Sequence, residues 1–216
     1  LDQDTSVYNV KDAYDDGNAD FHTIVAEMAE IPRDQAKTIN LGLFYGMGKT
    51  KLQAELGLSK EKANELFNTY HGKVPFVKQL MDKASNRAQE RGQIRTLLGR
   101  LCRFHLWEPN SFGMHKAMLH EDALQEHGPG IKRAYTYKAL NKLIQGSAAD
   151  MTKKAMLDLH NEGIIPHIQV HDELDISIEN ESQAKKIIEI MENAVKLEVP
   201  NKVDYEFGKN WGAIND

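Results

Sequence analysis

The sequence has a single cysteine, Cys102, among its 216 residues. One cysteine excludes an internal disulfide framework and a zinc site built from cysteines, so we expect a reducing compartment such as the cytoplasm. The sequence also lacks a secretory signal and any apolar run long enough to cross a bilayer, which predicts no membrane partner. A formal net charge of −5 gives no global argument for nucleic-acid binding, so any surface of that kind would have to be local.

Helical patterns dominate the first part of the chain, and mixed patterns follow. Good helix formers with apolar spacing continue to Gly92, a residue that favours a helix end. The segment QIRTLLGRLCRFHLW directly after it predicts a hairpin or bent strands. Residues 105–130 are predicted to be an insertion with one short helix, and a long helix is expected from about residue 131 to 161. This order favours an α+β fold with two subdomains, 1–92 and 93–216.

Residues 42–50, GLFYGMGKT, are partly similar to a phosphate-binding P-loop. A P-loop needs a glycine five positions before the glycine that precedes Lys-Ser/Thr, and that position is Leu43. A P-loop also follows a strand, whereas Pro32 and the residues after it predict a helix. We therefore favour a face of this helix, over about residues 32–46, for any phosphate chemistry, with the P-loop as the minor alternative.

Arg33, Lys37, Leu41 and Tyr45 step by four along the predicted helix, so they follow one face. Cations near the positive N-terminal pole of a helix suit a triphosphate. An apolar side chain and a ring near the other end suit a base and its sugar. The alternative is a surface helix whose cations are solvated and whose rings belong to the core.

The segment HIQVHDELDISIE alternates between apolar and polar residues on both sides of a polar centre. This pattern predicts a β-hairpin over about residues 166–179, with His171, Asp172 and Glu173 at its tip. A tight turn holds carboxylates rigidly, and Mg²⁺ is typically bound by one or two carboxylates together with substrate phosphate oxygens. The alternative is a polar turn between strands, since Asp is a favoured turn residue.

Asn141 and Gln145 stand four residues apart in ALNKLIQGSAAD, so two amides lie on one helical face. Amides can donate to minor-groove acceptors that A·T and G·C pairs present in similar positions. Such a pair would test the shape of a duplex without reading its sequence. The alternative is helix–helix packing over the small residues that follow.

Taken in order, RDQAKTINLGLFYG, NKLIQGSAAD and IQVHDEL resemble the C-terminal polymerase half of the DNA polymerase I family, family A. An Asp-x-His ahead of the first helix, Asp20 and His22, also matches, and the resemblance runs from about Tyr14 to the C-terminus. It implies a helical fingers subdomain over 1–92 and a C-terminal palm over 93–216, with a small antiparallel sheet packed with helices. It also implies a template-directed DNA polymerase that transfers dNMP from a dNTP to a primer 3′-hydroxyl on primer-template DNA.

The resemblance further implies roles for single residues. For the dNTP they are His22, Arg33, Lys37, Leu41 and Tyr45, and for DNA they are Gly46, Asn141, Gln145 and His171. Asp172 would hold metal and, with Glu173 and Lys37, form the catalytic group. The implied cofactor is a pair of Mg²⁺ ions, for which Mn²⁺ is a substitute.

The sequence also departs from the family's pattern. Leu41 stands where the family has Phe or Tyr, and Tyr137 stands where it has Arg, which leaves Arg133 or Lys138 as substitutes. The first palm motif, Asp-Tyr-Ser with the other metal-binding Asp, is absent. We therefore expect the C-terminal part of a split, virus-encoded polymerase, active in the host cytoplasm only with an N-terminal segment that carries the thumb and first palm motif. The alternative is a non-catalytic DNA-binding or processivity module that keeps the fold.

Overall fold

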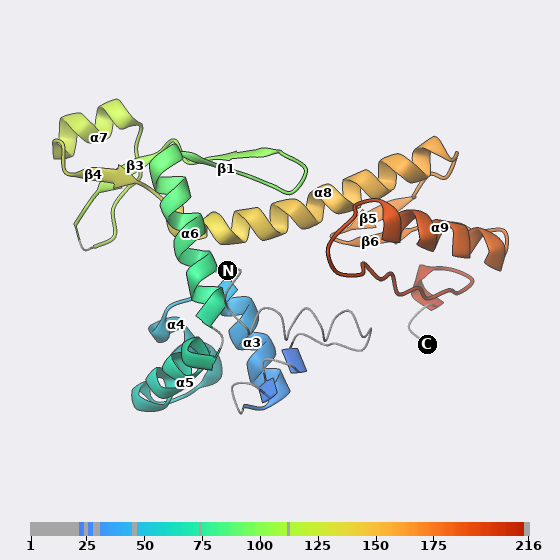
Figure 1. Ribbon diagram of the computed structural model, residues 1–216, viewed down its shortest axis with the longest axis horizontal. Coiled ribbons are helices and arrows are strands. Elements are labelled where there is room, and N and C mark those ends of the chain that lie inside the picture. Colours follow the sequence, from blue (N-terminus) through green and yellow to red (C-terminus); the bar gives the residue numbers. More distant parts are fainter. Residues whose placement is uncertain are drawn as a thin grey trace. The chain divides into compact units, whose positions relative to one another are not determined.

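The structure is a computed structural model of the chain (Figure 1). It describes residues 22–23, 26–27, 31–44, 47–73, 75–111 and 113–213. The chain divides into two compact units, Leu1–Ile144 and Gln145–Asp216. Each unit has buried apolar residues of its own, so each is held together by its own core.

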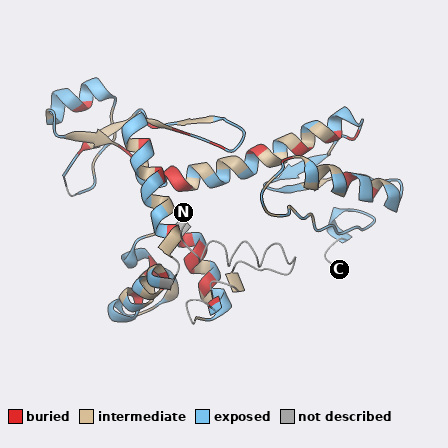
Figure 2. Cartoon of the chain, viewed as in Figure 1, coloured by how far each residue is buried: buried red, intermediate tan, exposed pale blue. Residues whose placement is uncertain are grey.

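Helices follow one another through the first unit. They are α3 (Arg33–Phe44), α4 (Lys49–Leu56), α5 (Lys60–Lys73) and α6 (Pro75–Arg91). Fully buried residues of these helices form one shared core, namely Ala36, Ile39, Leu52, Tyr70 and Val77. Figure 2 colours the buried positions of the chain red. Burying an aliphatic side chain of this kind contributes about 1.5–3 kcal/mol. This core therefore fixes which face of α3 points inward and which stays exposed.

The predicted hairpin after α6 is confirmed: β1 (Gln93–Arg95) pairs antiparallel with β2 (Leu101–Arg103). Gly92 ends α6 with a φ of 66°, in the left-handed region that suits glycine. A Cβ at this position would lie 2.8 Å from the guanidinium carbon of Arg133. The backbone angle therefore favours glycine here, and a Cβ would in addition displace the end of the Arg133 side chain.

A second strand pair frames the insertion. Strand β3 (Trp107–Pro109) pairs antiparallel with β4 (Ile131–Arg133), and α7 (His120–His127) lies between them in the sequence. The long helix expected from about residue 131 is therefore wrong at its start, because α8 (Ala139–Asn161) begins only after a short 3₁₀ turn, η1 (Thr136–Lys138). Residues 131–133 find hydrogen-bond partners on a strand distant in the sequence, and local helical periodicity does not reveal such a partner.

Arg133 joins the insertion to the rest of the first unit. Its Nε donates to the carbonyl of Gln89 at 3.1 Å, and its Nη1 donates to the carbonyl of Phe104 at 3.0 Å. Its guanidinium also lies 4.5 Å from the ring centroid of Trp107, a cation–π contact. These contacts occupy the side chain within the fold, so they disfavour Arg133 as the substitute for the family's arginine.

The second unit contains the rest of α8, a hairpin and a last long helix. Strand β5 (Ile168–Val170) pairs antiparallel with β6 (Glu173–Asp175), and α9 (Glu181–Asn193) follows them. Leu159, Ile164 and Ile187 form the buried core of this unit. A short 3₁₀ turn, η2 (Trp211–Ala213), lies near its end.

Helix α9 has a side-chain cap at its N-terminus. Asn180 Oδ1 accepts from the backbone N–H of Gln183 at 3.0 Å, and Gln183 Oε1 accepts from the N–H of Glu179 at 2.7 Å. The reciprocal bond thus reaches one residue further than in a standard capping box, in which it returns to the N-cap residue itself.

The predicted α+β class with small antiparallel sheets is confirmed. The boundary between the compact units falls after Ile144, within α8. The division into fingers and palm is a functional one, and it stays a prediction. No helix among the described residues has the length and apolar character needed to cross a membrane.

Candidate functional site

The exposed face of α3 carries most of the predicted dNTP-binding residues. Arg33 and Lys37 are exposed, and Leu41 is 42% exposed although it is aliphatic. The opposite face is buried through Ala36 and Ile39. The predicted row of two cations followed by an apolar side chain is therefore present on the outer surface of the helix.

The remaining predicted residues of this segment are Tyr45 and Gly46, and both lie outside the described residues. Their assignments to the dNTP and to DNA stay predictions.

A chain of hydrogen bonds links the inner side of α3 to His22. The hydroxyl of Tyr70 donates to Asn40 Oδ1 at 2.7 Å, and Asn40 Nδ2 lies 3.1 Å from His22 Nδ1. Asn40 is 1% exposed and Tyr70 is fully buried, and burial also raises the pKa of the Tyr70 hydroxyl. The hydroxyl therefore stays protonated near neutral pH and keeps its role as donor.

This chain of bonds assigns the tautomer of His22. Since the Asn40 oxygen accepts from Tyr70, its NH₂ group is the one that faces His22, so Nδ1 of the ring is the acceptor. In a neutral imidazole the proton then resides on Nε2. His22 is thus oriented as an Nε2–H donor, which suits a phosphate oxygen as its partner.

Asn40 and Tyr70 are site residues that the sequence analysis did not identify. In the sequence, only Asn40 itself pointed to this arrangement. It is a polar residue directly after Ile39, and both lie on the buried side of α3. A buried asparagine needs hydrogen-bond partners, and this requirement could have prompted a search for them. Tyr70, thirty positions away, gave no such signal.

The hairpin tip holds His171 and Asp172 in the turn, and Glu173 is the first residue of β6. All three are exposed. His171 has a φ of 52°, a left-handed conformation that costs a residue with a Cβ roughly 1–2 kcal/mol. The side-chain amide of Gln169 donates to the His171 carbonyl and helps to hold this turn. The sequence prediction of a carboxylate-bearing tip is therefore confirmed as local structure.

The carboxylates at this tip suit a magnesium ion that is also bound by a substrate. Among the described residues, no group of three or more His, Cys, Asp or Glu side chains is placed to hold a metal ion. A complete protein cage is therefore not formed by this part of the chain. An exposed Asp172 with Glu173 beside it does suit Mg²⁺ held by one or two carboxylates together with the phosphate oxygens of a substrate.

Asn141 and Gln145 lie on α8, as predicted, one helical turn apart. Asn141 is half-buried and Gln145 is exposed. Just before α8, the Lys138 amine lies 5.1 Å from the ring centroid of Tyr135 and 5.6 Å from that of Tyr137. Both rings and the lysine are exposed, so Lys138 is better placed than Arg133 to meet an anion.

Exposed cations near a helix N-terminus and exposed carboxylates are side chains of the kinds that phosphoryl-transfer chemistry uses. The family described as DNA polymerase family A matches residues 6–213, and the chain belongs to this family. The predicted resemblance is confirmed.

Named relatives agree with this membership. The chain is 34% identical to a DNA-directed DNA polymerase of Pseudomonas phage M6, over 96% of this chain and 33% of that protein. It is also 34% identical to DNA polymerase I of Geobacillus stearothermophilus, over 88% of this chain and 21% of that protein. The chain thus spans about a fifth to a third of the length of these relatives.

A solved structure has a similar fold. It is the POL domain of Pol1 from M. smegmatis in complex with DNA primer-template and dNTP, with a TM-score of 0.75 and 28% identity. The comparison covers 96% of this chain and 36% of that one. Its bound DNA and dNTP are properties of that protein.

Proposed function

We propose that the chain is the fingers and C-terminal palm portion of a template-directed DNA polymerase. The reaction is attack of a primer 3′-hydroxyl on the α-phosphate of a dNTP, with pyrophosphate as the leaving group. The observation that carries the proposal is the exposed row of Arg33, Lys37 and Leu41 on α3, together with a histidine oriented by buried partners. Family membership and the dNTP-bound relative support it.

The triphosphate would meet α3 near its N-terminal end. Arg33 and Lys37 supply charge-assisted hydrogen bonds, and the positive pole of the helix adds to their attraction. His22 would donate from Nε2 to a phosphate oxygen. Lys37 would also stabilise the negative charge that grows on the leaving pyrophosphate. Leu41 would contact the sugar, and Tyr45 would border the template base.

The hairpin would supply the metal-binding part of the site. Asp172 would hold Mg²⁺, with Glu173 beside it, and Mn²⁺ is a chemically reasonable substitute. When bound, a pair of such ions activates the attacking oxygen and stabilises the leaving one. A pair of divalent ions would need more carboxylate than Asp172 and Glu173 supply, and the Asp-Tyr-Ser motif that carries a further aspartate in the family is not among these 216 residues. We infer that a further polypeptide segment supplies it.

Primer-template DNA would be held by polar side chains on two elements. Asn141 and Gln145 would donate to the shared minor-groove acceptors and thereby test the shape of the newly formed pairs. His171 would contact the primer strand near the reacting end, and Gly46 would permit close approach of the template. These contacts check geometry and not sequence, as a template-directed enzyme requires.

Primer extension by reconstitution tests this proposal. The chain is mixed with the N-terminal remainder of the phage M6 relative, which should include the Asp-Tyr-Ser segment, and with primer-template, dNTP and Mg²⁺. We expect extension that is lost in Asp172→Ala and retained in Asp204→Ala, an exposed aspartate outside the site. A non-catalytic binding module would bind the DNA without extending it in any of these mixtures.

A further inference from the structure

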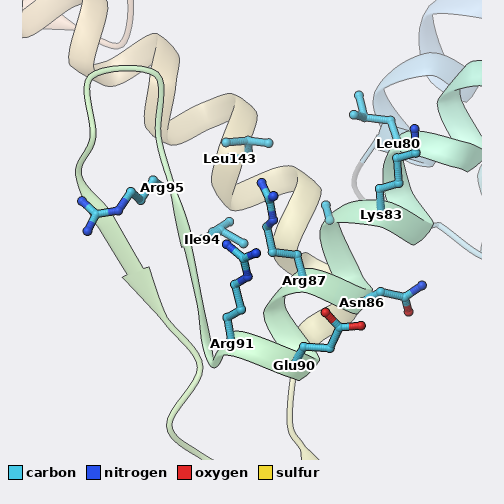
Figure 3. Close-up of a pocket in the computed structure, with 10 residues that line it drawn as sticks. Leu80, Lys83, Asn86, Arg87, Glu90, Arg91, Ile94, Arg95 and Leu143 are labelled. Atoms are coloured by element: carbon cyan, nitrogen blue, oxygen red, sulfur yellow. The ribbon is translucent and has the colours of Figure 1, made fainter. Parts of the chain in front are cut away.

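A hollow of about 500 Å³ opens on the first unit between α6, β1 and the first turns of α8 (Figure 3). Its floor is apolar and is formed by Leu80, Ala84, Ile94 and Leu143. None of the residues assigned above to dNTP, DNA or metal lines it. The hollow therefore has no role assigned in the reaction proposed above.

The rim of this hollow is strongly basic. Lys83, Arg87 and Arg91 line it from α6, and Arg95 lines it from β1, against one acidic residue, Glu90. Four cations and one carboxylate give the lining a net charge of +3, on a chain whose net charge is −5. The concentration of positive charge is thus local and opposite in sign to the chain as a whole.

The three cations of α6 form a row. They are four residues apart, so they succeed one another by about 6 Å along the helix axis. All three are exposed, and within the described part of the chain none of them forms an ion pair. Figure 3 shows Arg87 and Arg91 extending from α6 toward the floor residues Ile94 and Leu143. Arg95 differs, since its Nη1 donates to the carbonyl of Gly99 at 3.1 Å.

An exposed row of cations beside an apolar floor indicates an extended polyanion that also carries apolar groups. A row of cations can neutralise several phosphates of one nucleic-acid strand. Arginine binds phosphate with two parallel hydrogen bonds, and its planar guanidinium stacks on bases. A hollow of about 500 Å³ accommodates a drug-sized group. An unpaired nucleotide has about that size. In a duplex the base faces are covered by their neighbours.

We propose that this basic hollow binds single-stranded DNA, with phosphates on Lys83, Arg87 and Arg91 and a base or sugar against the half-buried Leu80 and Leu143. In the reaction proposed above, this strand is the unpaired part of the template. That last assignment rests on the proposed function, whereas the binding of a single strand does not.

Salt-dependent binding of a fluorescent oligothymidine by the 216-residue chain is the test. The variant is Lys83→Gln/Arg87→Gln/Arg91→Gln, and the control is Lys60→Gln/Lys62→Gln/Lys185→Gln, which removes the same charge from exposed lysines elsewhere. Each phosphate contact contributes about 0.7 to the slope of log K against log salt for a single strand. We expect the variant to lower the slope by about two and the control to leave it nearly unchanged.

Equal slopes in the variant and the control would overturn the proposal, because only the overall charge would then matter. Thermal unfolding of both triple variants, which change exposed side chains only, checks that the comparison is made between folded proteins.

Two further ligands test whether the hollow binds a nucleic-acid strand or an acidic peptide. An abasic oligonucleotide should bind the unaltered chain more weakly than oligothymidine, because it leaves the apolar floor uncovered. Polyglutamate should compete poorly. Equal binding of the abasic strand together with strong competition by polyglutamate would replace the single-stranded DNA site with a docking site for an acidic peptide.

Failure of this proposal and failure of the proposed function give different results. If the chain is no polymerase, extension fails in every reconstituted mixture while oligothymidine binding still depends on the α6 cations. If the hollow binds no strand, the α6 variant binds oligothymidine like the control, whatever the outcome of the extension assay.

Discussion

The Tyr70 hydroxyl donates a 2.7 Å hydrogen bond to Asn40 Oδ1, and this bond determines which end of the Asn40 amide faces His22. Both residues are buried, so neither finds water as an alternative partner. A core tyrosine on α5 therefore orients a histidine at the proposed triphosphate site, through one asparagine on the inner face of α3.

Replacing Tyr70 with phenylalanine should remove this bond and leave the buried Asn40 oxygen without a donor. An unsatisfied buried acceptor costs about 1–3 kcal/mol in the free energy of unfolding. Urea unfolding of Tyr70→Phe measures the loss, and Tyr205→Phe at an exposed ring is the control. A loss no larger than that of the control would mean that the Tyr70–Asn40 bond is not formed in solution.

Replacing Lys37 with alanine should weaken dNTP binding and leave primer-template binding nearly intact. The loss of a charge-assisted hydrogen bond is about 1.5–3 kcal/mol, which corresponds to about ten- to hundred-fold in nucleotide KM. The reconstituted enzyme gives the KM, and Lys60→Ala, an exposed lysine on α5, is the control. An equal loss of DNA affinity in Lys37→Ala would instead make α3 a DNA-contact surface.

Leu41 should make the enzyme discriminate strongly against dideoxynucleotides. A branched aliphatic side chain neither stacks as a ring does nor offers a hydroxyl in place of a missing 3′-OH. We expect Leu41→Tyr to relax this discrimination and Leu41→Met to preserve it, measured as the ratio of kcat/KM for dNTP and ddNTP. An unchanged ratio in Leu41→Tyr would show that Leu41 does not face the sugar.

His71 on α5 should make stability depend on pH. Burial lowers its pKa, Lys78 and Lys49 lower it further, and Asp82 partly opposes them. The folded state therefore binds a proton less readily than the unfolded state, whose histidine pKa is about 6.5. The contribution of neutral His71 is complete above that pH, and it decreases as the pH falls through 6.5 toward the lower folded pKa.

Urea midpoints between pH 5 and 8 measure this dependence. We expect His71→Gln to lose less stability on acidification than the unaltered chain, by at most about 1.4 kcal/mol per pH unit. His160→Gln, at an exposed histidine, should follow the unaltered chain. If the urea midpoints of all three proteins changed with pH in parallel, the result would contradict a lowered pKa of His71.

Local structure was predictable where local sequence decides it. The four-residue spacing on α3, the hairpin tip at His171 and Asp172, and the Asn180 cap all follow from short segments, and the structure contains them. The start of α8 was not predictable in this way, because β4 is defined by its pairing with Trp107–Pro109.

The same distinction holds for the candidate site. Exposed cations and carboxylates have recognisable spacings, so Arg33, Lys37 and Asp172 could be proposed from the sequence, and the structure places all three at exposed positions. Their roles stay predictions. The residues that orient His22 were not, since Asn40 and Tyr70 meet only through tertiary packing. The basic hollow combines residues of α6, β1 and α8, and no single segment indicates it.

The central claim is that Asp172 provides one of two metal-binding carboxylates and that the second comes from outside these 216 residues. Primer extension with Mg²⁺ by the 216-residue chain, alone and with the Asp-Tyr-Ser segment of a family A relative added in trans, tests it most directly. We predict no extension by the chain alone, extension in the mixture, and loss of extension again with Asp172→Ala. Robust extension by the chain alone would contradict the account and would require a second metal-binding carboxylate within it.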